Sequence, residues 1–257
     1  MNLKGLRVVL TRPQGQNEEL ADAVRAAGGE PIIFPVLAIA DPEDTAPLLA
    51  RLRDLPAYNL AIFISPNATH RAMTLIQAQG GWPADLSAAT VGPASAKALR
   101  DYGVTRVLVP AGPFDSEHLL ALPELQNMQG KRVIIFRGQG GRELLAETLR
   151  GRGAQVDYAE CYRRVLPHID AQPLRDAGAR GTIDAIVATS SEGLRNLHAM
   201  LGPESRSWLL PIPLFLPHAR IADQARGLGH SRIVATGPGD DGLLSALGAF
   251  SARVGHP

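Results

Sequence analysis

The chain has 257 residues, of which 45% are apolar and 20% charged, the composition of an ordinary globular protein with one large domain or two small ones. Its 26 basic and 25 acidic side chains give a formal net charge of +1. No block of like charge indicates a nucleic-acid-binding arm or a membrane-binding patch. A polyanionic partner would therefore have to be bound by local groups, not by the overall field.

Cys161 is the only cysteine, which excludes an intramolecular disulfide and a cysteine-based zinc site. A single thiol is typical of the reducing cytoplasm. The N-terminal sequence has no signal-peptide core, and the apolar stretches at 32–40 and 208–216 contain proline and are too short to span a bilayer. The seven histidines show no metal-ligand spacing. These features predict a soluble cytoplasmic protein with no metal and no membrane segment.

Short β-prone runs alternate along the chain with amphipathic segments of helical period. The run at 7–11 predicts a buried strand, and it leads into a helix at 17–27 that ends at Gly28-Gly29. Strands separated by helix-length segments are typical of βαβ units and a mostly parallel sheet. The further predicted strands are 31–34, 60–64, 88–91, 107–109, 132–136, 183–188, 214–216 and 233–235.

The sequence contains an internal repeat with an offset of 125 residues, the separation of Arg12 and Arg137. Any two α/β halves share some glycine and leucine spacing, but many landmarks in one order at a nearly constant offset favour a duplication. The matching pairs are Gln14 with Gln139, Gly15 with Gly140, Leu20 with Leu145, Gly28 with Gly153, Ser65 with Ser190, 91–94 with 216–219, and, at an offset of 124, 115–120 with 239–244.

The repeat predicts two α/β lobes with a cleft between them. No long linker separates the halves, because the chain at 127–130 runs directly into a strand. The segments 34–38 and 158–163 occupy matching places and are β-prone. If each repeat sends its first βα element into the other lobe, these segments would form a two-stranded ladder. The predicted lobes are then 1–37 plus 165–257, and 38–164.

The carboxyl ends of the predicted strands carry small, hydroxyl-bearing or glycine residues where helices begin. Ligands of open parallel sheets bind at these ends, and free backbone amides at helix N-termini suit carboxylates or phosphates. Capping of the helix explains each such residue taken alone, but six such ends exceed what capping requires. The predicted binding residues here are Thr11, Ser65, Asn67, Gly92, Ser95, Gly138, Thr189, Ser190 and Ser191.

Arg12, Arg137 and Arg142 lie at or just beyond strand ends, where a guanidinium can bind a carboxylate through two hydrogen bonds. The alternative for each is a solvated surface arginine. His218 follows a predicted strand and is a further candidate to line the cleft. The pattern after Arg137 matches a dinucleotide-binding loop only in part, because Glu143 stands where the third glycine is required.

Tyr162 is the most interesting titratable residue. It lies in the predicted ladder segment beside Arg163 and Arg164, where its side chain would face the cleft. A phenol keeps its proton at neutral pH, so Tyr162 is a candidate proton donor. The alternative is a tyrosine that packs on the ladder with its hydroxyl in solvent.

Several short motifs follow one another in a recognisable order over nearly the whole chain. They are Leu10-Thr11-Arg12-Pro13, Phe63-Ile64-Ser65-Pro66-Asn67-Ala68, Val91-Gly92-Pro93, Ser116-Glu117 with Leu119-Leu120, Phe136-Arg137-Gly138 with Gly141-Arg142 and Leu145, Gly153-Ala154, Tyr162-Arg163, Thr189-Ser190-Ser191 and His218-x-Arg220. Each is weak alone, but the ordered set is specific. Together they resemble the uroporphyrinogen-III synthase family.

The resemblance implies an α/β fold of two flavodoxin-like lobes with parallel sheets, joined by a two-stranded β ladder, the first lobe being discontinuous. It also implies a cofactor-free lyase that acts on hydroxymethylbilane, a linear tetrapyrrole with eight carboxylates. The terminal hydroxyl leaves as water, and the substituted carbon of the last ring attacks to give a spiro intermediate. That intermediate fragments and recloses with the ring reversed, which gives uroporphyrinogen III.

The resemblance also assigns roles to residues. Tyr162 matches the family tyrosine that is proposed to protonate the departing hydroxyl, and the amides and arginines at the strand ends would bind the carboxylates. Ser95 stands where relatives often carry threonine, and Arg220 stands at its counterpart in the second repeat. A hydroxyl role there is therefore open. A monomer is expected.

Two other functions are compatible with two α/β lobes. A nucleotide-sugar glycosyltransferase would need larger lobes and a convincing nucleotide loop, which the sequence lacks. A solute-binding protein with a hinge would not be an enzyme, and the missing export signal counts against it.

Overall fold

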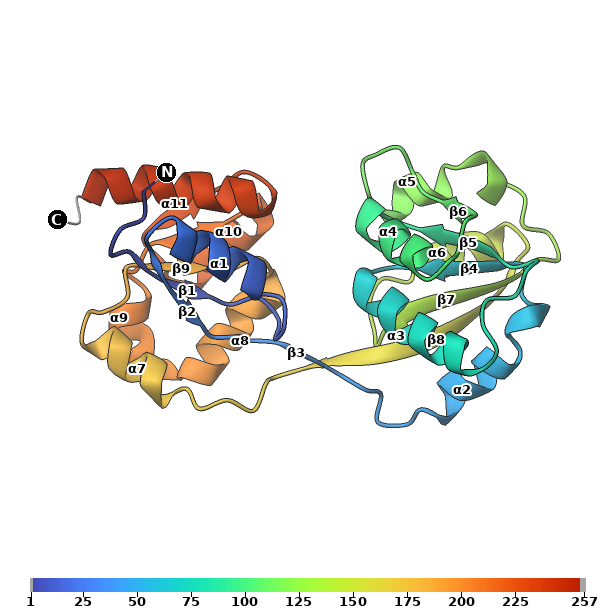
Figure 1. The fold of residues 1–257 in the computed structure, drawn as a ribbon, viewed down its shortest axis with the longest axis horizontal. Coiled ribbons are helices and arrows are strands. Elements are labelled where there is room, and N and C mark those ends of the chain that lie inside the picture. Colours follow the sequence, from blue (N-terminus) through green and yellow to red (C-terminus); the bar gives the residue numbers. More distant parts are fainter. Residues whose placement is uncertain (1, 255–257) are drawn as a thin grey trace. The chain divides into compact units, whose positions relative to one another are not determined.

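The computed structural model describes residues 2–254, and within them the chain forms two compact units (Figure 1). Unit 1 comprises the chain up to Ile39 and from Val165 onwards, and unit 2 comprises Ala40–Arg164. None of the helices in this described part combines the length and apolar character needed to cross a membrane.

Unit 1 contains a five-stranded sheet in the order β11-β10-β9-β1-β2, in which all neighbours are parallel. Its strands are only three or four residues long, and the central ones are buried on both faces, as expected for apolar runs in a parallel sheet. The strands are β1 (Arg7–Leu10), β2 (Glu30–Ile33), β9 (Ala185–Val187), β10 (Leu214–Leu216) and β11 (Ile233–Ala235).

Helices cover both faces of this sheet. Val8 and Leu10 pack under two helices on one face, while Val9 points to the other face, as the two-residue period of a strand requires. The first face is covered by α1 (Glu18–Ala26) and α11 (Gly239–Val254), and the second by α7 (Gln172–Ala179), α8 (Ser191–Leu201), α9 (Arg206–Leu209) and α10 (Ala219–Leu228).

Unit 2 is built on a six-stranded sheet in the order β3-β8-β7-β4-β5-β6, in which the strands from β8 to β6 are parallel. The strands are β3 (Ala38–Ala40), β4 (Leu60–Phe63), β5 (Ser87–Thr90), β6 (Val107–Leu108), β7 (Arg132–Gly138) and β8 (Gln155–Val165). The helices are α2 (Ala46–Arg53), α3 (Pro66–Ala78), α4 (Pro93–Asp101), α5 (Ser116–Leu120) and α6 (Leu144–Gly151), with 3₁₀ turns at Leu55–Ala57, Pro123–Leu125 and, in unit 1, Pro203–Ser205.

The two faces of the unit 2 sheet have separate cores. Ile62 and Ile135 pack with α5 and α6 on one face. On the other face Phe63 stacks on Phe136 with ring centroids 4.7 Å apart, and α3 packs against α4 and β7. Side chains one residue apart on β7 therefore serve different faces, which matters for the site described below.

The nine strands predicted by apolar runs are all present, with ends shifted by up to two residues. The ladder differs from the expectation. The partner of β8 is β3 at Ala38–Ala40, which overlaps the predicted segment 34–38 only at Ala38. The reason is that the Val36 and Leu37 carbonyls accept hydrogen bonds within unit 1, from the Asn196 amide and the Gln14 backbone N–H.

Both sheets have the same strand order when strands are numbered by their place in the repeat. Beginning with β2 in unit 1 and β8 in unit 2, each follows the order 2-1-3-4-5 of flavodoxin-like folds. Each sheet takes its first two strands from one repeat and the other three from the other repeat. The α/β fold class with two parallel sheets is confirmed.

His230 is a buried titratable residue that couples the stability of unit 1 to pH. Its Nε2 lies 2.9 Å from Nε2 of His198, and its Nδ1 has no partner. Burial lowers the pKa of His230 to about 4, with a smaller contribution from His198. Burial and then Arg206 lower the pKa of His198. The folded state therefore binds this proton less readily than the unfolded state.

We predict that the contribution of His230 to the free energy of unfolding is complete above about pH 6.5, the pKa of an unfolded histidine. This contribution is lost as the pH falls towards 4. One pKa unit corresponds to about 1.4 kcal/mol, so His230 accounts for at most about 3 kcal/mol of this loss. Urea unfolding at several pH values should show a flatter profile for His230→Gln than for wild type. The exposed His168→Gln should behave as wild type. An unchanged profile in His230→Gln would contradict the assignment.

Candidate functional site

The candidate site of unit 2 lies at the carboxyl ends of β4 and β7, where the strand order reverses. Such switch points are where open α/β sheets bind ligands. Ser65 follows β4 and is the N-cap of α3, its Oγ accepting a hydrogen bond from the Ala68 N–H at 3.2 Å. Gly138 ends β7 and is paired with Tyr162 on β8. The sheet thus brings three of the predicted site residues together.

A β-bulge determines the direction of the Tyr162 side chain. Arg137 pairs with Glu160, but the next residue, Gly138, pairs with Tyr162, so Cys161 is an extra residue on β8. A bulge redirects the side chains that follow it. Tyr162 consequently lies on the face of Gly138 and α3, whereas Tyr158 lies on the opposite face, that of α5 and α6.

Tyr162 is held by a close contact and a hydrogen bond. A Cβ built on Gly138 would lie 2.5 Å from the Tyr162 ring, so only glycine leaves room for the ring. The phenol oxygen lies 3.2 Å from Ser65 Oγ, and the residue is 4% exposed. Because the Ser65 oxygen already accepts from Ala68, its own proton remains available to the phenol oxygen.

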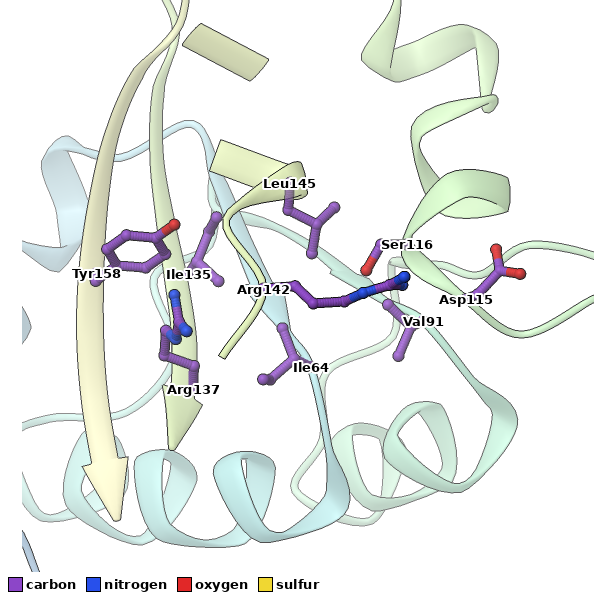
Figure 2. A pocket seen from close by; sticks show the side chains of 9 residues that line it. All are labelled: Ile64, Val91, Asp115, Ser116, Ile135, Arg137, Arg142, Leu145 and Tyr158. Atoms are coloured by element: carbon purple, nitrogen blue, oxygen red, sulfur yellow. The ribbon is translucent and has the colours of Figure 1, made fainter. Parts of the chain in front are cut away.

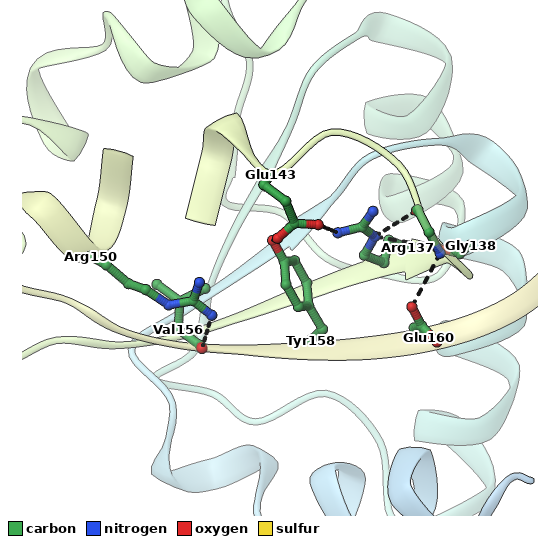
Figure 3. Close-up of polar contacts among 8 residues, drawn as sticks. Arg137, Gly138, Glu143, Arg150, Val156, Tyr158 and Glu160 are labelled. Carbon is green, nitrogen blue, oxygen red and sulfur yellow. Dashed lines mark hydrogen bonds and ion pairs between the residues drawn. The ribbon is translucent and has the colours of Figure 1, made fainter. Parts of the chain in front are cut away.

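Arg137 lies on the other face of β7 in a network of polar contacts (Figure 3). Its Nε donates to the Gly140 carbonyl at 3.0 Å and its Nη1 to Glu143 at 3.0 Å, while its guanidinium lies over the Tyr158 ring, 4.5 Å from the centroid. The Tyr158 hydroxyl donates to the other Glu143 oxygen at 2.5 Å. These contacts fix both the guanidinium and the loop after β7.

The two partners in this network have shifted pKa values. The hydrogen bond from Tyr158, followed by that from Arg137, lowers the pKa of Glu143, so the carboxylate stays ionised. Burial, and then the bond to Glu143, raises the pKa of Tyr158 to about 12, so the phenol keeps its proton. The network is therefore a fixed carboxylate between a guanidinium and a phenol.

The other predicted residues of unit 2 lie around the same strand ends. Asn67 is in the first turn of α3, Gly92 is the N-cap of α4, and Ser95 is buried in the first turn of α4. Arg142 precedes α6 and is largely exposed, with Nη1 3.2 Å from Glu117. It lines a pocket together with Arg137 (Figure 2).

Unit 1 has a matching arrangement at the ends of β1 and β9. Thr11 is buried and donates its hydroxyl to the Val187 carbonyl at 2.7 Å. Ser190 is the N-cap of α8 through the Gly193 N–H, 2.9 Å away, with Thr189 and Ser191 beside it. Arg12 binds both carboxylate oxygens of Asp240.

His218 and Arg220 are exposed at the start of α10, which follows β10. They lie one strand further from the switch point than Thr11 and Ser190. The structure thus groups the predicted residues by unit into two sets of strand ends.

Sequence reasoning missed two members of the Arg137 network. Glu143 was considered only as a substitute for a glycine, and Tyr158 only as part of the ladder. A signal was present for Tyr158, because it precedes Glu160 by two residues and so shares a strand face with the partner of Arg137. Residues 2–254 contain no group of three or more side chains suited to hold a metal ion.

The family model that matches the chain is described as uroporphyrinogen-III synthase HemD and covers residues 18–245. The chain is 37% identical to the uroporphyrinogen-III synthase of Salmonella typhimurium over 246 residues, which is 94% of this chain and all of the relative. It is 34% identical to the enzyme of Escherichia coli over 245 residues, with the same coverage. The chain belongs to the uroporphyrinogen-III synthase family.

Solved structures of uroporphyrinogen-III synthases share the fold of this chain. A mutant enzyme from Thermus thermophilus superimposes with a TM-score of 0.64 at 20% identity, covering 97% of this chain and 98% of the other. The enzyme of Helicobacter pylori gives 0.59 at 15% identity, covering 97% and 100%. Membership of the uroporphyrinogen-III synthase family disfavours both a glycosyltransferase and a solute-binding protein.

Gly138→Ala is expected to destabilise this uroporphyrinogen-III synthase homologue by about 1–3 kcal/mol, the usual cost of overpacking, because the new methyl group would overlap the Tyr162 ring. Denaturant unfolding measures the change. Gly151→Ala is the control, since Gly151 ends α6 with no atom near its added Cβ. Equal stability of the two variants would show that the ring does not need the bare backbone of Gly138.

Proposed function

We infer that the chain is a uroporphyrinogen-III synthase, a cyclising lyase of porphyrin and heme biosynthesis that acts on hydroxymethylbilane. The observation that carries this conclusion is the full-length match, 37% identity over 94% of the chain to an enzyme of that name. The reaction removes the terminal hydroxyl as water and closes the macrocycle with the last ring inverted. The alternatives, a nucleotide-sugar glycosyltransferase and a solute-binding protein, have no comparable support.

We propose that Tyr162 donates the proton that turns the terminal hydroxyl into water. Its phenol is held by the Ser65 hydroxyl at a switch point, which supports this role. Loss of water leaves an electrophilic, N-protonated azafulvene, because the electrons of the pyrrole itself expel the leaving group. The ring that attacks it later loses a proton, which restores the phenol. The remaining role of the protein is to position the linear tetrapyrrole for ring closure.

We propose that the strand ends of each unit supply groups that bind the substrate carboxylates. In unit 2 these are the amides and side chains around Ser65, Asn67, Gly92 and Ser95, with Arg137, Gly138 and Arg142. In unit 1 they are Thr11, Arg12, Thr189, Ser190, Ser191, His218 and Arg220. Helix N-termini such as those of α3 and α8 favour anions, which supports the assignment. Side chains of this kind need no bound cofactor for the proposed chemistry.

We further propose that the enzyme works as a monomer in the cytoplasm. Its one cysteine is free and buried, which suits a reducing compartment. Among residues 2–254 the exposed large apolar side chains are few, Ile33, Phe114, Leu166 and Ile169, which is less than a stable oligomer interface needs.

The activity is tested by mixing purified protein with freshly made hydroxymethylbilane and separating the oxidised type I and type III isomers. Type III should predominate, because only an enzyme inverts the last ring. Buffer alone and heat-denatured protein are the controls. An isomer ratio equal to that in buffer would refute the proposed function.

Tyr162→Phe should keep the fold and lower kcat for type III formation by about 100-fold, the lower end of the range for general acids. Tyr102→Phe is the matched control, since the Tyr102 hydroxyl makes only an exposed contact with Thr74 at 3.5 Å. Steady-state rates of both variants provide the comparison. If the two rates are equal, Tyr162 has no part in the proton transfer.

A further inference from the structure

Unit 2 contains a cavity of ≈ 240 Å³ on the α5 and α6 side of β7 (Figure 2). It is smaller than the about 300–1,000 Å³ of pockets that enclose whole small ligands. A cavity of this size takes one substituent of a larger molecule. Its apolar walls are Ile64, Val91, Ile135 and Leu145, and its polar groups belong to Asp115, Ser116, Arg137, Arg142 and Tyr158.

Arg137 lines this cavity, and one of its terminal nitrogens makes no hydrogen bond. Its side chain is 4% exposed, and its Nε and Nη1 are satisfied by the Gly140 carbonyl and by Glu143. Its Nη2 is buried and has no partner. Buried donors of a charged group are almost always paired, because leaving them unpaired costs free energy.

Gly141 approaches this nitrogen closely and has no side chain to crowd it. A Cβ at this position would lie 2.7 Å from Arg137 Nη2, which is as close as a hydrogen-bonded oxygen atom would be. The φ angle of Gly141 is +118°, which also favours glycine. The loop therefore approaches the guanidinium with bare backbone.

The guanidinium is already fixed for binding. Tyr158 lies against its face, and Glu143 is half exposed, so the partner carboxylate keeps contact with water while the guanidinium does not. A guanidinium held in this way loses little conformational entropy when it binds a second carboxylate. Bidentate or paired contacts to a carboxylate are the strongest hydrogen bonds that arginine makes.

The remaining charged groups favour one orientation of a bound anion. The Asp115 carboxylate lines the cavity, where it accepts from the His118 N–H and lies 2.6 Å from the His118 ring. It would repel an anion from that part of the wall. Arg142 is largely exposed and contacts Glu117. The carboxylate end of a ligand is thus directed to Arg137.

We propose that this cavity is a subsite for one carboxylate-bearing side arm of the tetrapyrrole. The carboxylate accepts from Nη2 of Arg137 beside Gly141, and the alkyl part of the arm packs on Ile135 and Leu145. The subsite lies on the face of β7 opposite to Tyr162, and both are near the carboxyl end of this strand. The identity of the ligand rests on the proposed function, whereas the carboxylate chemistry rests on the geometry.

The subsite is tested on the full chain with sodium propionate as the probe and sodium chloride as the reference. The Nε–Hε resonance of Arg137, assigned by its loss in Arg137→Lys, is followed by NMR up to about 100 mM, since one charge-assisted contact gives only millimolar affinity. A saturable shift with propionate and not with chloride is expected. Gly141→Ala should weaken binding at least about 10-fold, because its Cβ would lie within hydrogen-bond distance of Nη2 and compete with the carboxylate for that space.

Arg150→Lys is the matched control, since Arg150 also lies near the Tyr158 ring but donates to the Val156 carbonyl outside the cavity. It should bind propionate as wild type does. No saturable shift in the wild type, or equal affinity in Gly141→Ala, overturns the subsite. The wild-type titration decides the matter even where a variant fails to fold.

The substrate reaction separates failure of the subsite from failure of the proposed function. If wild type forms the type III isomer, Gly141→Ala should raise KM for hydroxymethylbilane about 10-fold while Arg150→Lys leaves it unchanged. An unchanged KM in Gly141→Ala would count against the subsite alone. Absence of type III product in the wild type would refute the function, whereas propionate binding at Arg137 would still stand.

Discussion

The contact between the Tyr162 ring and the bare backbone of Gly138 is the constraint on which the candidate site depends. The ring can reach this position only because the extra residue Cys161 turns the strand, and it can stay only because Gly138 has no side chain. The phenol oxygen then meets Ser65, whose place is fixed by the start of α3. The position of the Tyr162 hydroxyl is thus fixed by three features: the bulge at Cys161, the glycine at 138 and the helix cap Ser65.

Both repeats form the same strand-end backbone, but only the second repeat has the tyrosine, Tyr162. In the first repeat Leu37 stands where the second repeat has Tyr162, and the backbone bond is kept in both copies, from Gln14 to Leu37 at 2.9 Å and from Gln139 to Tyr162 at 2.7 Å. Ser65 and Ser190 likewise cap equivalent helices. Candidate anion-binding groups are therefore present in both units, whereas the candidate proton donor belongs to unit 2 alone.

Apolar runs and turn residues were enough to predict the α/β class and the strands, because these depend on local patterns. The position of the ladder was not predictable from local sequence. It depends on a hydrogen bond from the Asn196 side chain, 160 residues away, which holds the Val36 carbonyl within unit 1. The bulge at Cys161 has no local signal either. Tyr162 was identified as a candidate, but its direction followed from pairing, and the Glu143 carboxylate gained its role only through Tyr158.

The equivalent arginines of the two repeats differ in their hydrogen bonding, which would let a duplicated scaffold bind a substrate unequally. Both terminal nitrogens of Arg12 donate to Asp240, so its charge is already paired with a carboxylate. Arg137 gives one nitrogen to Glu143 and keeps the other unpaired beside Gly141. A tetrapyrrole with eight carboxylates offers similar groups along its whole length. An enzyme that must invert one particular ring has to distinguish its ends, and two unlike arginine sites can do so where two identical ones could not.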